Sequence, residues 1–210
     1  MEKKKILYIH GFRSSAKSST ITRLQRQWTD FEIHAIDVNH HPAESIAAIE
    51  RYVQEHDIDL LMGTSLGGYY VLAANLAVPK VVVNPVIEPG VSLDREDMYG
   101  TLDYFNERAD GVQTMVVERD FLKEFDGIPL HVDSRTRIIG STHDELLGDL
   151  TATYRELVGD RFTPTDMIGH RINERLTAPG GILHQNAMQA LEDPLAFDSA
   201  ADAQKWMDEL

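Results

Sequence analysis

The chain has 210 residues, and its 42% hydrophobic and 26% charged content is that of an ordinary globular protein. It contains no cysteine, which excludes disulfides, thiolate metal sites and a cysteine nucleophile. Its 34 acidic residues outnumber the 20 basic ones, and the formal net charge of −14 disfavours nucleic acid and anionic membrane surfaces as partners.

Short apolar runs alternate with amphipathic stretches in the first half of the chain. The apolar runs predict strands at residues 5–9, 31–38, 58–62 and 80–84. Helical spacing of apolar residues predicts helices at 18–28, 42–53 and 66–76. No apolar run approaches the ~20 residues of a membrane span, and the run after the N-terminal lysines is shorter than the ~7–15 residues of a signal-peptide core. The sequence therefore predicts a cytoplasmic protein without a membrane span.

Residues 86–126 interrupt this alternation. The segment is rich in charged and aromatic residues and contains one plausible strand, at 114–117. Because it follows the carboxyl end of a strand, we interpret it as a small cap over a ligand crevice, with a plain surface excursion as the alternative. The alternation then resumes with strands at 137–140 and 163–168, a helix at 146–158 and a C-terminal helix within 193–210.

Strands that alternate with helices predict a three-layer α/β fold. Parallel strands joined by right-handed crossovers form a mostly parallel central sheet with helices on both faces. We expect residues 1–210 to form a single domain of the α/β-hydrolase type, with the small insertion described above.

The sequence Gly63-Thr64-Ser65-Leu66-Gly67 matches the Gly-x-Ser-x-Gly nucleophile elbow. In this motif the serine sits on a strained turn between a strand and a helix, and the two glycines allow close backbone approach. An apolar strand precedes the motif here and a helical pattern follows it. The sequence therefore predicts Ser65 as a nucleophile.

A serine nucleophile needs a base and an acid, which follow it in the order Ser, acid, His in this fold. Asp144 lies in a loop after a predicted strand, and His170 follows the last predicted strand. Their separation leaves room for one helix and one strand. Glu145 and Asp133 remain alternatives for the acid, and His184 remains the alternative for the base.

The negative charge that develops on the substrate carbonyl needs backbone N–H donors. We expect these from Leu66, directly after the nucleophile, and from Phe12 in the loop after the first strand. The substrate pocket is predicted to involve Arg13, Tyr69 and Pro85, with Arg13 able to hold a carboxylate. No metal-ligand spacing and no nucleotide-binding motif stands out, so we expect neither metal nor cofactor.

These residues resemble those of the YqiA/YcfP-type small esterases of the α/β-hydrolase superfamily. The resemblance covers residues 5–170 and is strongest at 63–70, where Gly68-Tyr69-Tyr70 extends the elbow. It implies an α/β-hydrolase fold, esterase activity on short acyl esters, and a triad carried over to Ser65, Asp144 and His170. The chain beyond His170 looks longer than in that family, which keeps His184 open as the base.

The expected function is hydrolysis of a carboxylic ester or thioester through an acyl-enzyme on Ser65, with a small-molecule acyl ester or thioester as the partner. An acyltransferase with the same triad is one alternative, and a non-catalytic binding protein of the same fold is another. The sequence does not fix the acyl group or the oligomeric state.

Overall fold

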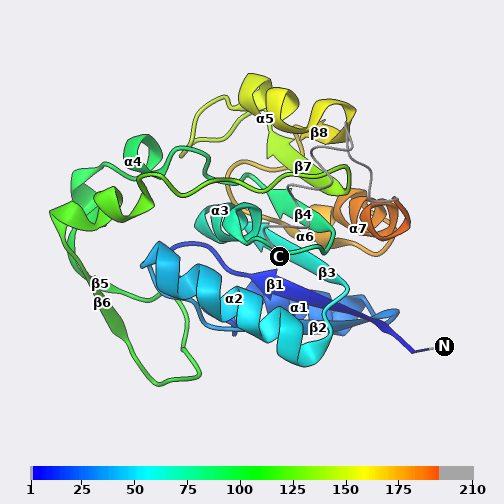
Figure 1. Cartoon of the computed structure of the whole chain (residues 1–210), viewed down its shortest axis with the longest axis horizontal. Helices are drawn as coiled ribbons and strands as arrows, with labels where there is room; N and C mark the ends of the chain where they lie inside the picture. Colours follow the sequence, from blue (N-terminus) through cyan, green and yellow to red (C-terminus); the bar gives the residue numbers. More distant parts are fainter. Residues whose placement is uncertain (1, 194–210) are drawn as a thin grey trace.

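The computed structural model of the protein describes residues 2–193 (Figure 1). Its centre is a sheet of six parallel strands in the order β2-β1-β3-β4-β7-β8. The strands are β1 (Lys4–Ile9), β2 (Phe31–Ala35), β3 (Leu60–Thr64), β4 (Lys80–Val83), β7 (Thr136–Ser141) and β8 (Phe162–Thr165). The predicted strands are confirmed to within a few residues at their ends.

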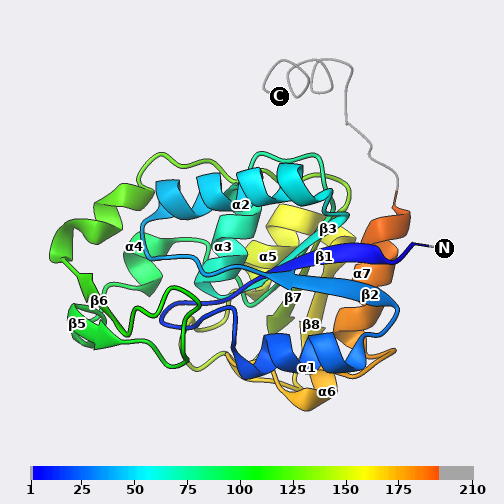
Figure 2. The ribbon, with the colours of Figure 1, turned by 90° about the horizontal axis from the view of Figure 1, so that it is seen from below.

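Helices cover both faces of this sheet (Figure 2). One face carries α2 (Pro42–His56), α3 (Leu66–Ala73) and α5 (Thr151–Val158). The opposite face carries α1 (Ser19–Gln27), α6 (Glu174–Thr177) and α7 (Ile182–Glu192). This arrangement confirms the predicted three-layer α/β fold.

The alternation of side chains along β1 explains why two cores form. Leu7 and Ile9 face the core beneath α2 and α3, whereas Ile6 and Tyr8 face the core beneath α1 and α7. All four are at most 1% exposed. A strand buried on both faces is continuously apolar, as in parallel sheets in general.

The predicted helix at 146–158 starts later than expected, at Thr151. Asp144 accepts hydrogen bonds from the N–H groups of Leu146 and Leu147, which satisfies them outside a helix. Gly148 then has a φ of 75°, a value that an α-helix does not tolerate. The turn after β7 therefore remains a loop until residue 150.

The segment between β4 and β7 contains α4 (Pro89–Ser92), the 3₁₀ helices η1 (Glu96–Met98) and η2 (Arg119–Phe125), and an antiparallel pair of strands. The pair is β5 (Gly100–Asp103) with β6 (Thr114–Val117), and it lies at one end of the molecule (Figures 1 and 2). The strand at 114–117 was predicted. Its partner was not, because a Gly-Thr-Leu-Asp sequence carries little strand preference on its own.

No helix in the described part of the chain is long and apolar enough to span a bilayer. The C-terminal helix predicted within 193–210 falls outside the described residues, apart from Asp193 at the end of α7.

Candidate active site

The strand order brings two loops together at the carboxyl edge of the sheet. The chain runs from β1 outward to β2 and returns to the other side of β1 as β3. Ile9 pairs with Gly63 in the β1–β3 register, so Gly11 and Ser65 lie side by side two residues further on. A reversal of strand order of this kind is where open α/β sheets bind ligands.

Ser65 occupies a tight turn between β3 and α3. Its backbone angles of φ 54° and ψ −126° are unusual for a residue with a side chain. Its N–H donates to the Val83 carbonyl at 3.1 Å, and its carbonyl accepts the N–H of Val86 at 3.1 Å. These bonds to β4 and the loop after it hold the turn in place.

The two glycines of the motif are required by close backbone packing. A Cβ on Gly63 would lie 2.7 Å from the Gly67 carbonyl oxygen. A Cβ on Gly67 would collide with the carbonyl oxygens of Ile9 and His10. Helix α3 therefore starts directly against the end of β1, which fixes the position of the Ser65 side chain.

Three side chains from three different loops form a continuous hydrogen-bonded chain. Ser65 Oγ lies 2.9 Å from Nε2 of His170, and Nδ1 of His170 lies 2.8 Å from Oδ2 of Asp144. The hydroxyl, the imidazole and the carboxylate come from the carboxyl ends of β3, β8 and β7. The structure thus brings together all three residues that the sequence predicts as nucleophile, base and acid.

Asp144 is nearly buried, with its side chain 4% exposed. Burial opposes its ionisation, but hydrogen bonds from His170 and from the Leu147 and Leu146 N–H groups outweigh this, so its pKa is below the ordinary value. The carboxylate is therefore ionised at neutral pH and can orient the imidazole by accepting its Nδ1–H.

The loop that carries His170 is held by Glu145, which the sequence offers as an alternative acid, and by Asn84, for which the sequence predicts no role. Glu145 Oε2 accepts the His170 backbone N–H at 2.8 Å. Asn84, fully buried at the end of β4, donates from Nδ2 to the carbonyls of Gly169 and His170. Its Oδ1 accepts the Ser141 N–H at 2.7 Å, which connects the His170 loop to the end of β7.

Of the two N–H groups expected beside Ser65, that of Phe12 belongs to the loop after β1 and that of Leu66 to the start of α3. A Cβ on Gly11 would lie 3.2 Å from the Cβ of Ser65, so the two backbones are almost in contact. The Phe12 N–H has no backbone partner within residues 2–193, and the Leu66 N–H, at the first position of α3, has no intrahelical acceptor. Both donors are therefore available to a ligand.

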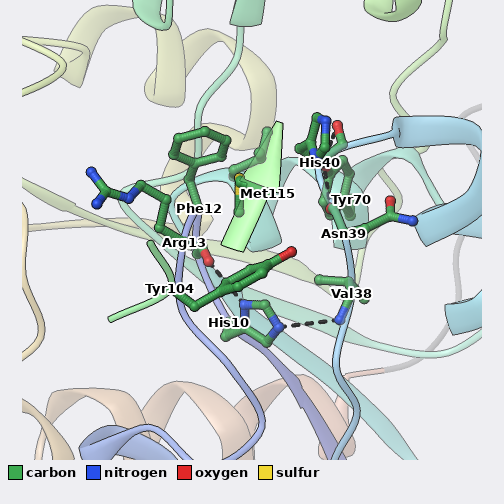
Figure 3. Close-up of a pocket in the computed structure, with 11 residues that line it drawn as sticks. His10, Phe12, Arg13, Val38, Asn39, His40, Tyr70, Tyr104 and Met115 are labelled. Atoms are coloured by element: carbon green, nitrogen blue, oxygen red, sulfur yellow. Dashed lines mark hydrogen bonds between the residues drawn. The ribbon is translucent and has the colours of Figure 1, made fainter. Parts of the chain in front are cut away.

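His10 links this loop to the loop that follows β2 (Figure 3). Its Nδ1–H donates to the Gly11 carbonyl at 2.9 Å, and its Nε2 accepts the Val38 N–H at 3.1 Å. Burial lowers the pKa of His10 to about 4, which keeps the ring neutral as these two bonds require. Behind the loop, His10, Phe12 and Tyr104 line a small cavity of about 10 Å³.

A second cavity, of about 580 Å³, opens over Ser65 and His170. Arg13 lines it, as the sequence predicts. Tyr69 and Pro85 do not. Tyr69 is 2% exposed and packs edge-on against Tyr70 and Phe125, while Pro85 packs against Gly68. The face of α3 that carries Tyr69 is turned into the core, away from the turn that presents Ser65.

The segment after β4 lines the same cavity. It contributes apolar side chains and one arginine. Its lining residues are Ser92, Leu93, Arg95, Asp97, Met98, Phe105 and Asn106.

Two of the three alternatives, His184 for the base and Asp133 for the acid, have partners away from Ser65, whereas Glu145 binds the His170 backbone as described above. His184 lies on α7, where its ring packs edge-on against Trp28 at 4.9 Å and against Phe31 at 5.6 Å between ring centres. Asp133 forms an ion pair with Arg135 at 3.1 Å. Neither residue lines the cavity over Ser65.

Comparison with known proteins identifies the family. The sequence model of UPF0227, described as an uncharacterised protein family, matches residues 5–158. The chain belongs to the UPF0227 family. A UPF0227 protein from Pectobacterium carotovorum is 27% identical over 169 residues, which cover 74% of this chain and 86% of that protein. This result confirms the resemblance drawn from the sequence.

Solved structures with the same fold include esterases. The esterase domain of a Rhodothermus marinus protein is 18% identical with a TM-score of 0.61, and the match covers 90% of this chain and 87% of that one. Est1E from Butyrivibrio proteoclasticus, solved with ferulic acid bound, is 13% identical with a TM-score of 0.65 and 91% of each chain covered. At these identities the likeness establishes the α/β-hydrolase fold of this UPF0227 protein.

Proposed function

We propose that this protein hydrolyses a carboxylic ester or thioester through an acyl-enzyme on Ser65. The hydrogen-bonded chain from Ser65 Oγ through His170 to Asp144 carries this proposal. A serine hydroxyl is a weak nucleophile until a base removes its proton, and the 2.9 Å contact puts Nε2 of His170 within reach of that proton.

In the acylation step, Ser65 Oγ forms a bond to the acyl carbonyl carbon while Nε2 of His170 takes the hydroxyl proton. Asp144 accepts the Nδ1–H, which fixes the tautomer and stabilises the imidazolium that results. Collapse of the tetrahedral intermediate breaks the bond to the alcohol or thiol, which leaves with the proton from Nε2. The acyl group remains on Ser65.

The carbonyl oxygen of the tetrahedral intermediate carries a negative charge. The Phe12 and Leu66 N–H groups would bind it, because both lie beside the Ser65 turn and neither has an intramolecular backbone acceptor there. One such donor contributes about 10²–10³-fold to kcat in a serine protease.

Deacylation repeats these steps with water. Nε2 of His170 takes a proton from water, the hydroxyl oxygen attacks the acyl carbon, and the proton passes to Ser65 Oγ as the acid leaves. Esterases among proteins of the same fold support a hydrolase.

The substrate in this proposal is a small acyl ester or thioester, for which a cavity of about 580 Å³ is large enough. Residues 86–126 act as a small cap, because seven of them line this cavity. The apolar lining by Leu93, Met98, Leu146 and Ile172 suits a short acyl chain.

A panel of 4-nitrophenyl esters from acetate to octanoate tests the proposal. Wild-type protein should release nitrophenol, and Ser65→Ala and His170→Ala should each lower kcat by several decades, because triad members act as a unit. His184→Ala is the matched control and should retain turnover. Activity that survives in Ser65→Ala, or is lost only in His184→Ala, would contradict the assignment. Adding an alcohol acceptor to the same assay distinguishes an acyltransferase by its new ester product.

A further inference from the structure

The cavity over Ser65 has a charge opposite in sign to that of the whole chain. The net charge of the protein is −14, yet Arg13, Arg95 and Arg171 line this cavity. Asp97 is the single acidic residue among the described residues that line it. Because charges at a distance are screened within about 8 Å at physiological salt, a group bound in the cavity interacts mainly with these arginines.

Arg13 is held in place by Asp103, the last residue of β5, and by Phe105, two residues further on. Its Nε donates to the Asp103 carbonyl at 2.8 Å, and its guanidinium lies 4.4 Å from the centre of the Phe105 ring. The Phe105 N–H donates in turn to the Arg13 carbonyl at 2.7 Å. The side chain is thus fixed through Nε, and its two terminal nitrogens make no hydrogen bond within residues 2–193.

Arg171 directly follows the proposed base. It is exposed, and no ion pair among the described residues includes either Arg171 or Arg13. Arg95 is different, because it pairs with Asp97 at 3.3 Å. Two guanidinium groups on the cavity wall therefore have no anionic partner in the described protein.

The amino-terminal end of α1 lines the same cavity with Ser18, Ser19 and Thr20. Ser18 caps this nine-residue helix by accepting the Ile21 N–H. The first N–H groups of a helix have no intrahelical acceptor and carry partial positive charge, which favours an anion. The helix end thus adds to the field of the two unpaired arginines.

We propose that the substrate carries an anionic group, a carboxylate or a similar oxyanion, in its acyl or its alcohol half. Arg13 and Arg171 bind this group, supported by the amino-terminal end of α1. Guanidinium groups suit this role because they bind carboxylates through paired N–H donors and stay charged at all relevant pH values. The inference specifies the substrate class of the esterase proposed above and rests on that function.

Three chromogenic esters of matched size test whether the site prefers an anionic substrate and in which half of the substrate the anionic group lies. The neutral reference is 4-nitrophenyl pentanoate. The mono-4-nitrophenyl ester of glutaric acid carries a carboxylate in the acyl half, and the pentanoate ester of 5-hydroxy-2-nitrobenzoic acid carries it in the leaving group. The quantity compared is the ratio of kcat/KM for each anionic ester to that for the neutral ester, at one fixed ionic strength.

Arg13→Gln and Arg171→Gln remove one guanidinium each and keep a polar side chain. Arg26→Gln is the matched control, because Arg26 lies at the far end of α1, is exposed and does not line the cavity. For at least one anionic ester, we expect the ratio to fall about 10-fold in each cavity variant, the scale of one lost charge-assisted hydrogen bond. In Arg26→Gln it should stay within about twofold of wild type.

Binding to Ser65→Ala, measured by calorimetry with the same esters, gives a second readout that needs no turnover. Tighter binding of an anionic ester than of the neutral one, lost in Ser65→Ala/Arg171→Gln, supports the inference. Unchanged ratios and equal binding of all three esters would overturn it, even if the neutral ester is hydrolysed through Ser65. If no ester is hydrolysed, the proposed function fails, and the binding comparison still decides whether the cavity selects anions.

Discussion

Asp144 and Glu145 are adjacent acids with different contacts to the same histidine. Asp144 accepts the Nδ1–H of the His170 ring, whereas Glu145 accepts the backbone N–H of His170. Asp144→Asn should therefore lower kcat by up to about 10⁴-fold, because an amide can stabilise the wrong tautomer. Glu145→Gln keeps an acceptor oxygen and should lower kcat by no more than about 10-fold. Steady-state kinetics on one ester compare the two, and the reverse order would assign the acid to Glu145.

Substitution of Asn84 tests whether its hydrogen bonds to the His170 loop are needed for catalysis. Asn84→Asp keeps the acceptor for the Ser141 N–H and suits the positive φ of 44°, but it can no longer donate to the Gly169 and His170 carbonyls. We expect kcat to fall by about 10–100-fold with little change in KM, since small displacements of a catalytic group are costly. A folded Asn84→Asp protein with wild-type kcat would remove Asn84 from this positioning role.

At the scale of the elements, the close packing of α3 against the end of β1 leaves no room for a side chain at Gly67. Gly67→Ala would place a methyl group against the carbonyl oxygens of Ile9 and His10, and these cannot move without displacing the Phe12 loop. We expect a loss of about 1–3 kcal/mol in the free energy of unfolding, the range for overpacked sites. Urea denaturation measures this loss, and activity should fall with it.

Gly90→Ala is the control for that substitution. Gly90 lies in the short helix α4, and a Cβ there would meet nothing within 4 Å. The unfolding free energy should change by no more than about 0.5 kcal/mol. Equal stability of the two variants would contradict the close packing of α3 on β1.

The elements that the sequence predicted well are those whose signals are local. The elbow around Ser65 needs particular residues at neighbouring positions, and the order of Asp144 and His170 follows from the succession of strands. Strand β5, the Asn84 bridge and the convergence of Arg95 and Arg171 depend on contacts between distant segments. Such contacts cannot be inferred from the periodicity and spacing of residues in the sequence. For the same reason, the prediction that Tyr69 and Pro85 line the pocket was wrong.

At the scale of the whole molecule, a buried lysine makes stability depend on pH. Lys80, 2% exposed at the start of β4, donates to the Ala74 and His131 carbonyls. Burial lowers its pKa to about 7, although Asp133 and Glu50 partly oppose this. Between pH 7 and about 10.4, the ordinary lysine value, the unfolded chain therefore binds a proton that the folded chain does not.

The consequence is that Lys80 favours the folded state increasingly as pH rises through this window. The slope is at most about 1.4 kcal/mol per pH unit. Lys80→Met removes the titrating group, so the stability of wild type relative to this variant should rise between pH 7 and 10. Urea denaturation at four pH values measures the difference. Parallel stability curves would show that Lys80 keeps its ordinary pKa in the folded protein.

The central claim, that His170 activates Ser65 as a nucleophile, is tested most directly by covalent labelling. A fluorophosphonate reacts with an activated serine and leaves an adduct whose position peptide mass spectrometry determines. We predict a single adduct on Ser65 in the wild type, and labelling slowed at least about 100-fold in His170→Ala. An adduct on another serine, no adduct on Ser65, or equal labelling rates in both proteins would contradict the account.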